Sequence, residues 1–373
     1  MLDRHPTERG LSALLGAGVI LCALAFPSLA GADTFCVQPE ASCAAANTHA
    51  TVQGALDAAN GNGAGVRDTV LLGAATYTEN VTDVGGNQVD IVGKGTAQTT
   101  ITSPGNFGTT TLSLGDAFST VSALTIQIPG GGNNTGLALV GDANGVAVVE
   151  QGGDFGHVGV DLQNSGASLS GSTVTMTAGT AAQSFSGGTV RDSRLSGSGG
   201  FNGFGTIRRS RVTAGNTAVG LSGGSTIENT VVRPQGGSGS FVGVFGFSGS
   251  NSFSVDVRNV TIAGEGIAGT VGVALNSTQS FGSAPALSAA VTNTIIRGMG
   301  TDLRATVNDG FQAGTPTAQI AIQSSDFDPA KTNTSGGGQI FPGPGNINAD
   351  PLFADSAGGD FALRTGSPAI DHG

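Results

Sequence analysis

Short apolar bursts alternate with polar residues along most of the chain, and one arrangement of them raises a problem of parity. In "VTNTIIRG" (291–298), Val291 and Ile296 are spaced like core anchors but lie five residues apart. Side chains an odd number of residues apart point to opposite faces of a flat strand. The backbone therefore has to reset its alternation between the two anchors, and Asn293 stands at that point.

The same spacing recurs. With the asparagine site numbered zero, the anchors stand at −2 and +3, and position +1 holds Ser, Thr or Val in every clear copy. The zero site is mostly Asn, Asp, Gly or Ser, and Asn, Asp and Gly readily adopt the left-handed αL conformation. We predict a bend there, after which +1 and +3 point inward. The zero sites are Gly171, Asp192, Arg209, Asn229, Asn259, Asn293 and Ser324, and an earlier, looser copy is "VSALTI" (121–126).

A second series of short segments precedes these corners. It comprises "NTGLAL" (134–139), "HVGVDL" (157–162), "NTAVGL" (216–221), "FVGVFG" (241–246) and "TVGVAL" (270–275). Copies about 17–34 residues apart are typical of a solenoid of strands and turns. Stacked coils would bring Asn229, Asn259 and Asn293 about 4.8 Å apart, so we predict a ladder of hydrogen-bonded amides.

These corners and coils resemble the right-handed parallel β-helix, or pectin lyase-like, fold. "DTVLLGAATYTENV" (68–81) and "VDIVGKGTAQTTIT" (89–102) are similar to the first coils of many such secreted proteins. "NADPLFADSAGGDFALRTGSPAIDHG" (348–373) resembles the C-terminal region of bacterial choice-of-anchor Q proteins, in which further strands and an anchor usually follow. We therefore expect an all-β protein with a parallel β-helix over 66–345 and a choice-of-anchor Q-like segment over 346–373.

The N-terminus has the features of a secretory signal. Arg4 and Arg9 precede the apolar run "LSALLGAGVILCALAF", and small residues follow it. We predict a signal peptide over 1–32, with cleavage after Ala32 and no later membrane segment. Export would expose Cys36 and Cys43 to an oxidising compartment, where we expect them to form a disulfide.

A helix is expected before the first coil. "ATVQGALDAAN" (50–60) places Val52, Ala55, Leu56 and Ala59 at helical spacing. A covering helix protects the unpaired strand edge at the end of a solenoid. Residues 33–65 are therefore predicted to form an N-terminal cap that holds both the disulfide and the helix.

Composition and charge limit the partners. Of 373 residues 64 are Gly, 11% are charged and 38% are hydrophobic, which favours many short strands over a disordered chain. The net charge is −11, and the signal peptide removes as many acidic as basic residues. Nucleic acids and anionic membranes are thus poor partners. An acidic polysaccharide would be repelled unless calcium bridged it.

Few residues carry candidate chemistry. The second series would form the exposed sheet where enzymes of this fold keep their sites, and its outward positions are expected to be largely Gly136, Ala138, Gly159, Ala218, Gly220, Gly272 and Ala274. The exceptions are His157 and Asp161, with Glu150 and Asp154 in the preceding turn. His157 and Asp161 would point outward about 13 Å apart, too far to pair directly. These four residues are catalytic candidates, and a solvated strand and turn is the alternative.

Two further surfaces could bind ligands. Phe241 and Phe245 would share the outer face and stack on sugars if Val242 and Val244 point inward; otherwise they are buried. The insertions 246–253 and 276–288 are loop-like in composition and would form a wall beside them. The −1 positions Arg191, Arg208, Glu228 and Arg258 would stack as an anion-binding stripe or as exposed ion pairs.

Two functional classes follow. The first is a non-catalytic, monomeric secreted or cell-surface module that contacts carbohydrate or another surface polymer without a metal or cofactor. The alternative is a polysaccharide lyase or glycoside hydrolase with an atypical site near Glu150–Asp161, for which calcium would be a cofactor. The "NTD", "GHG" and "RIK" motifs of polygalacturonases are absent, and so are adjacent aspartates.

Overall fold

The computed structural model describes residues 31–371 apart from 64, 106, 154, 237–239, 280–282 and 309–313. The predicted signal peptide lies almost entirely outside the described residues. Within the described ranges, no helix is long and apolar enough to cross a membrane.

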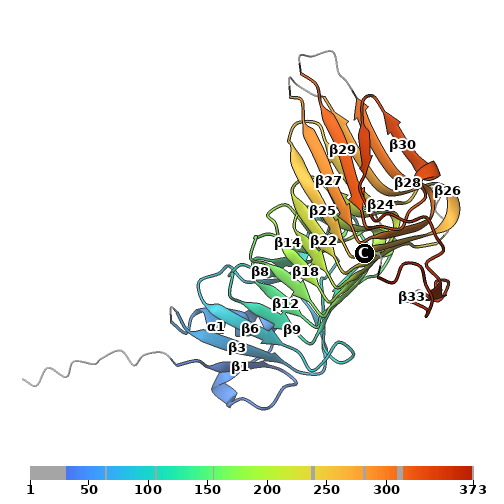
Figure 1. The fold of residues 1–373 in the computed structure, drawn as a ribbon. Helices are drawn as coiled ribbons and strands as arrows, with labels where there is room; N and C mark the ends of the chain where they lie inside the picture. Colours follow the sequence, from blue (N-terminus) through green and yellow to red (C-terminus); the bar gives the residue numbers. More distant parts are fainter. Residues whose placement is uncertain are drawn as a thin grey trace, which may run out of the picture. The chain divides into compact units, whose positions relative to one another are not determined.

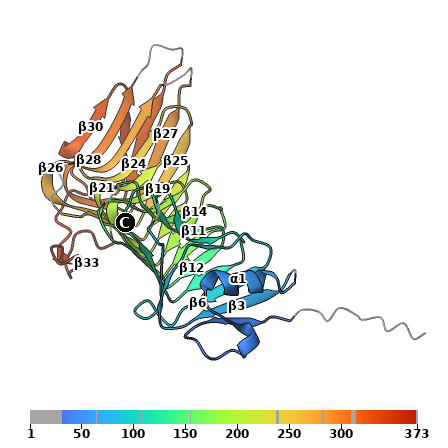
Figure 2. The same ribbon diagram turned by 180° about the vertical axis from the view of Figure 1, so that it is seen from behind.

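From Ala32 onward the chain forms one compact unit, a right-handed parallel β-helix as predicted (Figure 1, Figure 2). A complete coil contributes one strand to a 14-stranded parallel sheet, turns at a corner, and then contributes two consecutive stretches to a 17-stranded sheet. We call these two stretches the first and the second series. The 17-stranded sheet therefore carries two outer faces, one for each series.

The 14-stranded sheet holds the strands that precede the corners. In order along the stack these are β2 (Thr48–His49), β1 (Thr34–Val37), β3 (Arg67–Leu72), β6 (Gln88–Val92), β9 (Thr120–Ser122), β12 (Asp142–Asn144), β15 (Ser168–Ser170), β18 (Thr189–Arg191), β20 (Thr206–Arg208), β22 (Ser225–Glu228), β25 (Phe253–Arg258), β27 (Ala286–Thr292), β29 (Thr317–Gln323) and β31 (Gln339–Pro342).

The 17-stranded sheet holds both series. The first comprises β4 (Thr76–Thr78), β7 (Thr100–Thr102), β10 (Thr125–Ile128), β13 (Ala147–Glu150), β16 (Thr173–Thr175) and β23 (Val231–Pro234). The second comprises β5 (Val81–Thr82), β8 (Thr110–Leu114), β11 (Thr135–Leu139), β14 (Val158–Leu162), β17 (Thr180–Ser184), β24 (Val242–Ser248) and β30 (Thr332–Ser335). Four strands run through both: β19 (Arg194–Gly203), β21 (Arg211–Leu221), β26 (Thr261–Thr278) and β28 (Ile295–Asn308).

Every predicted corner has the predicted backbone. The φ angle is positive at Ala123, Gly171, Asp192, Arg209, Asn229, Asn259, Asn293 and Ser324, between 46° and 56°. Gly145, with φ 63°, is a further corner that the sequence analysis missed. The −2, +1 and +3 side chains around the corners are buried, as Val291, Thr294 and Ile296 illustrate. One αL residue therefore resets the alternation and brings both anchors into the core.

Two ladders of side chains run along the corner edge. The amide Nδ2 of Asn259 donates to Asn229 Oδ1 at 3.3 Å, and Asn293 Nδ2 donates to Asn259 Oδ1 at 2.6 Å, which confirms the predicted amide ladder. Beside it, the buried N–H of Ser193 donates to the hydroxyl of Ser210 in the next coil at 3.2 Å. That hydroxyl donates to the Arg208 carbonyl in its own coil at 2.8 Å. Position +1 thus favours Ser and Thr because a buried N–H needs an acceptor.

The second series does not alternate as predicted. Thr135 pairs with Val158 and Leu137 with Val160. In β14, Gly159 and Val160 are both buried in succession, so each strand has one inward-facing residue more than strict alternation allows. A Cβ on Gly159 would lie 2.5 Å from Val174 Cγ1, inside the core. Gly136, Gly159, Ala218 and Gly272, predicted to face outward, therefore face inward, each beside a second inward residue. Ala138, Gly220 and Ala274 stay on the outer side, in register with Asp161.

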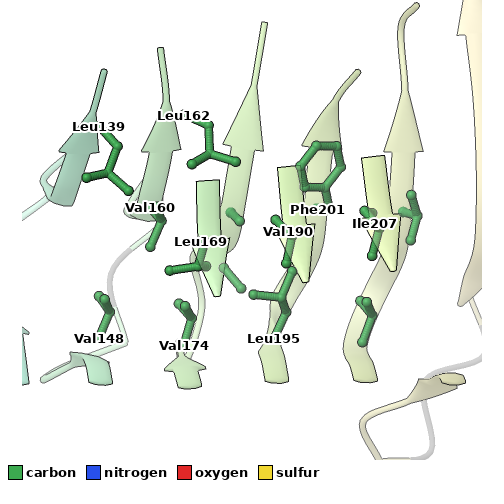
Figure 3. Close-up of a cluster of buried hydrophobic side chains, with 14 of the residues drawn as sticks. Leu139, Val148, Val160, Leu162, Leu169, Val174, Val190, Leu195, Phe201 and Ile207 are labelled. Atoms are coloured by element: carbon green, nitrogen blue, oxygen red, sulfur yellow. The ribbon is translucent and has the colours of Figure 1, made fainter. Parts of the chain in front are cut away.

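The core is a set of columns in which each coil adds one layer. Figure 3 shows Val148, Val174 and Leu195 stacked in one column and Leu169, Val190 and Ile207 in another; Leu139 and Leu162 form a further column, and Phe201 is in register with Val160. All are at most 1% exposed. Burying such side chains stabilises the fold by about 1.5–3 kcal/mol each.

The N-terminal end carries the predicted helix and disulfide. Helix α1 (Val52–Asn60) buries the four predicted residues, Val52, Ala55, Leu56 and Ala59. The Glu79 carboxylate accepts hydrogen bonds from the N–H groups of Val52 and Gln53 at its N-terminus. Cys36 and Cys43 are joined by a disulfide. Strand β1 also pairs with β3, so part of the predicted cap extends the sheet itself, and the 3-10 helix η1 (Ala45–Asn47) follows the disulfide.

Two predicted loops are strands instead. Residues 246–248 belong to β24 and 276–278 to β26, while β25 begins at Phe253 and β27 at Ala286. The Gly246 Cβ position points at Leu275 and at the ring of Phe253, so the added strand ends bury residues against each other. The described ends of the insertions therefore lengthen both sheets, in place of the wall of loops that was predicted.

The last residues turn back along the stack. After the 3-10 helix η2 (Pro329–Lys331) come β30 and β31, and then an antiparallel hairpin of β32 (Phe353–Asp355) and β33 (Asp360–Leu363). The Gly359 carbonyl accepts a hydrogen bond from Arg211 Nη2. The hairpin tip therefore lies on the outer face of the first series.

The corner predicts a graded response to substitution at Asn259. Asn259→Gly keeps an easy αL backbone but removes two ladder hydrogen bonds, and Asn259→Ala also introduces αL strain. We expect the free energy of unfolding to fall by about 1–2 kcal/mol for Asn259→Gly and by about 1 kcal/mol more for Asn259→Ala. Urea unfolding measures both, with exposed Asn333→Ala as the control. Equal midpoints for Ala and Gly would show that the corner carries no strain.

Substitution of an inward glycine should destabilise the fold more than substitution of an outward glycine in the same sheet. Gly159→Val should destabilise the fold by several kcal/mol or abolish folding, because its Cβ would also lie 2.5 Å from the Ala181 carbonyl oxygen. Gly220→Val should cost little, since the nearest atom to its Cβ is 3.4 Å away. Thermal melting of both variants distinguishes the inward from the outward position, and similar melting temperatures would refute the assignment.

Candidate functional site

The structure brings two of the four predicted catalytic residues together, but inside the protein. His157 Nδ1 accepts the N–H of Asn134 at 3.1 Å, and its Nε2 lies 4.0 Å from Glu150 Oε1. The other oxygen of Glu150 accepts hydrogen bonds from the N–H groups of residues 177–179 at 2.7–3.3 Å. Neither side chain is exposed to solvent. The Glu150 carboxylate therefore holds the turn before β17 and is closed to a sugar.

The prediction that His157 points outward is wrong, and the extra inward residue explains why. Gly159 and Val160 both face the core, so His157 and Asp161, four residues apart, lie on opposite sides of the sheet. Asp161 does face outward, where its Oδ2 accepts from Gln163 Nε2 at 3.0 Å. Asp154 lies outside the described residues.

The same irregularity separates the two candidate stacking residues. Gly243 and Val244 both point inward, so Phe241 lies in the core with no exposed surface. The proposed stacking role of Phe241 is therefore wrong. Phe245 is half-buried on the outer face, and its ring lies 6.3 Å from that of Phe247, with 25° between the ring planes.

Phe245 and Phe247 belong to two outer rows that run along the second series. The strand register gives the first row as Asp161, Gln183, Asn202, Gly220 and Phe245. The second row, two residues further along each coil, is Gln163, Phe185, Phe204, Ser222 and Phe247. Each row spans four strand spacings, about 19 Å.

Phenylalanines dominate the second row. Phe185 is 55% exposed and Phe247 46% exposed. The ring of Phe204 covers the backbone of the neighbouring coils, since a Cβ at Gly223 would lie 2.9 Å from it. We call Phe185, Phe204, Phe245 and Phe247 the phenylalanine patch. Phe185 and Phe204 were not predicted as candidate binding residues, because each follows a strand whose sequence does not indicate a ligand site.

Polar groups lie beside the patch. Among the described residues, the amides of Gln183 and Asn202 have no hydrogen-bond partner, and Asp161 is the sole carboxylate in the two rows. Between the coils of Phe204 and Phe247 the two rows have only the small residues Gly220 and Ser222. The surface thus offers apolar rings beside free amides.

Two of the three −1 arginines, Arg191 and Arg258, form ion pairs, as one alternative predicted, whereas Arg208 has no carboxylate partner among the described residues. Their register is Arg191, Arg208, Glu228 and Arg258 on successive coils. Arg258 lies 3.2 Å from Asp256 and 3.7 Å from Glu228. At the neighbouring corner, Arg209 lowers the pKa of Asp192 by hydrogen bonding to it. Arg191 and Arg258 are therefore neutralised, and the Nε of Arg208 is buried, so the column is a poor candidate for an anion site.

Asp302 is a buried carboxylate in the column of small inward residues, where other coils have Gly or Ala. One oxygen accepts the N–H of Asp328 at 2.7 Å, and the other has no partner among the described residues. Burial raises the pKa of Asp302 to about 6.

In the part of the chain that the structure describes, no group of three or more His, Cys, Asp or Glu could hold a metal ion.

Comparison with known proteins supports no assignment beyond the fold. No protein-family model matches the chain, and no curated protein sequence does either. Among solved structures, the chain is similar to a tailspike of the Acinetobacter baumannii bacteriophage Fri1, a capsular polysaccharide depolymerase, with a TM-score of 0.41 and 12% identity over 84% of this chain and 63% of that chain. The chain thus spans less than two thirds of the tailspike's length.

Two further likenesses are of the same kind. The catalytic domain of an α-1,3-glucanase gives a TM-score of 0.38 with 11% identity, over 80% of this chain and 67% of that chain. The A-module of an Azotobacter vinelandii mannuronan C-5 epimerase gives 0.35 with 13% identity, over 80% and 94%. The chemistry of this chain therefore has to be argued from its own side chains.

Asp302 predicts a pH dependence of stability. Its folded-state pKa of about 6 lies above the ordinary value of 3.8, so the folded protein binds the proton more tightly than the unfolded chain. The ionised carboxylate destabilises the fold above pH 6, and this cost is relieved as the pH falls from about 6 to about 4. Asp302→Asn should raise the free energy of unfolding at pH 7.5 by on the order of 1–3 kcal/mol and leave it little changed at pH 4.

Urea unfolding of the wild type and Asp302→Asn across this pH range gives the difference directly. Asp161→Asn, on the outer face, is the matched control and should differ little from the wild type. A constant difference between wild type and Asp302→Asn from pH 4 to 7.5 would contradict the assignment.

Proposed function

We propose that the protein is an extracellular, non-catalytic carbohydrate-binding module that holds a polysaccharide along the two outer rows of the second series. The phenylalanine patch beside the free amides of Gln183 and Asn202 carries this proposal. Sugar rings have apolar faces of C–H groups and edges of hydroxyl groups. Exposed aromatic rings match the faces, and amides and a carboxylate match the hydroxyls.

The exposure of the patch also supports binding. Large apolar side chains grouped on a surface mark interaction sites more often than isolated ones do. The rows run along the stack, so a chain molecule would cross several coils and meet one row member per coil.

The alternative, a polysaccharide lyase or glycoside hydrolase, has less support. Glycoside hydrolysis generally uses two carboxylates flanking the scissile bond. Asp161 has no second carboxylate in the described rows, and Glu150 and His157 are closed to solvent. The disulfide is compatible with secretion. The signal peptide over 1–32, the choice-of-anchor Q-like segment over 346–373 and the monomeric state remain predictions.

The test is binding to a polysaccharide panel by wild type and by Phe185→Ala/Phe247→Ala. Loss of two ring contacts should weaken binding to the polymer bound best by about tenfold or more. The matched control is Phe155→Ala/Phe341→Ala, which removes two exposed rings, 82% and 47% exposed, outside the rows. Equal weakening by both double variants would contradict the proposal.

The same panel, incubated with and without calcium, tests catalysis. We expect no unsaturated or reducing-end products in either condition. Their appearance, and its loss in Asp161→Asn, would favour the enzyme alternative.

A further inference from the structure

The tip of the C-terminal hairpin lies where two arginines converge. Arg211 is on the outer face of β21 and Arg233 on that of the adjacent strand β23. A Cβ at Gly359 would lie 2.8 Å from Arg233 Nη1 and 3.2 Å from Arg211 Nη1. Two guanidinium groups from neighbouring coils thus point at one glycine, whose carbonyl takes a hydrogen bond from Arg211 alone.

Arg211 has no carboxylate partner among the described residues, and Arg233 has only a long contact with one. Within the described residues, no carboxylate oxygen lies within 4.0 Å of Arg211, and the nearest to Arg233 is Glu265 Oε1 at 3.9 Å. Arg194, in register with Arg211 on β19, is exposed and has no partner among the described residues. Like charges on adjacent strands disfavour one another unless an anion lies between them. A local excess of positive charge therefore stands out in a chain of net charge −11.

A hollow adjoins Arg233, one of the two converging arginines. It has a volume of about 340 Å³ and lies between Arg233, Glu265 and Gly264 on the sheet side and Ser356 and Phe361 on the hairpin side. A second hollow of about 430 Å³ continues from it and shares Ala263, Gly264 and Ser356. Both volumes lie in the range of small-ligand sites.

The continuation carries a further guanidinium. Arg297 lines the second hollow and donates to Asn348 Oδ1 at 2.8 Å, and it also pairs with the buried Asp326. Its Nε is buried and has no partner among the described residues. Phe353 lines this part, and its ring meets Phe361 edge to face at 5.1 Å. The space thus combines cationic donors with apolar ring surface.

We propose that this space is an oxyanion-binding site, in which Arg233 holds a carboxylate, sulfate or phosphate group of a ligand and the neighbouring Arg211, held at the hairpin tip by Gly359, adds positive charge. A guanidinium offers paired N–H donors that match two oxygens of such a group. The Gly359 carbonyl supplies only one acceptor for two guanidinium groups, and an oxyanion supplies the others. The site lies on the first series and does not rest on the phenylalanine patch.

The acidic groups around the site set its selectivity. Glu265 is 43% exposed and 3.9 Å from Arg233, so a closer oxyanion would take its place on the guanidinium. Asp355 is engaged with the Gly358 N–H at 2.9 Å within the hairpin turn. A neutral ligand would leave the arginines as they are and gain no such contact.

The test titrates the secreted protein with sodium sulfate, sodium phosphate and sodium acetate at constant ionic strength, following binding by calorimetry and NMR. We expect saturable binding of at least one oxyanion. Arg233→Gln and Arg211→Gln should each raise its dissociation constant at least tenfold. Arg258→Gln, which removes an ion-paired arginine from the 14-stranded sheet, is the matched control and should leave it unchanged. Hydrogen exchange in residues 353–363 should slow when the anion binds, because the hairpin forms one wall.

Trigalacturonate and maltotriose distinguish a carboxylated sugar from a neutral one. Tighter binding of trigalacturonate, lost in Arg233→Gln, would assign the carboxylate of a sugar as a source of the oxyanion. The absence of saturable binding for every anion, or the same affinity in Arg233→Gln and Arg258→Gln, would overturn the site. Circular dichroism and melting temperatures establish that each variant is folded, and none of these outcomes depends on the phenylalanine patch.

Discussion

The αL corner is the constraint on which the rest of the structure depends. A coil of this β-helix has to turn sharply and still direct side chains on both sides of the turn into one core. A single residue with positive φ does this, and it fixes which positions are buried before and after it. The buried N–H after the corner then needs an acceptor, which a Ser or Thr hydroxyl from the next coil supplies. Corner, core columns and hydroxyl ladder follow from that one backbone angle.

The corners could be predicted because their residue types indicate the αL backbone conformation. Asn, Asp and Gly are favoured at positive φ, so a parity problem at such residues has one simple solution. Even Arg209 and Ser324, which have no such preference, take αL angles because the copies around them fix the register. Helix α1 and the disulfide could be predicted equally well, because helical periodicity over 52–59 and an even cysteine count have few competing explanations.

The two successive inward residues in each strand of the second series could not be predicted in the same way. Gly and Ala fit the outer face as well as a crowded interior, so "HVGVDL" is compatible with either placement of Gly159. The structure places it inward, against Val174. The inward placement of Gly159 buries His157 and leaves Asp161 outside, and that of Gly243 does the same for Phe241 and Phe245. The candidate site therefore failed at residues whose direction depends on a position that carries no side-chain signal.

The amide ladder has a direction as well as a position. Asn293 donates to Asn259, and Asn259 donates to Asn229, so every bond points toward the N-terminal end of the stack. Their dipoles are therefore aligned, and hydrogen bonds in such a chain polarise one another. The corner edge thus has a polarity: its first member keeps a donor and its last an acceptor beyond the row. The row lies inside the stack, between the corners of Arg209 and Ser324, so the ladder fixes the orientation and register of three consecutive coils from within.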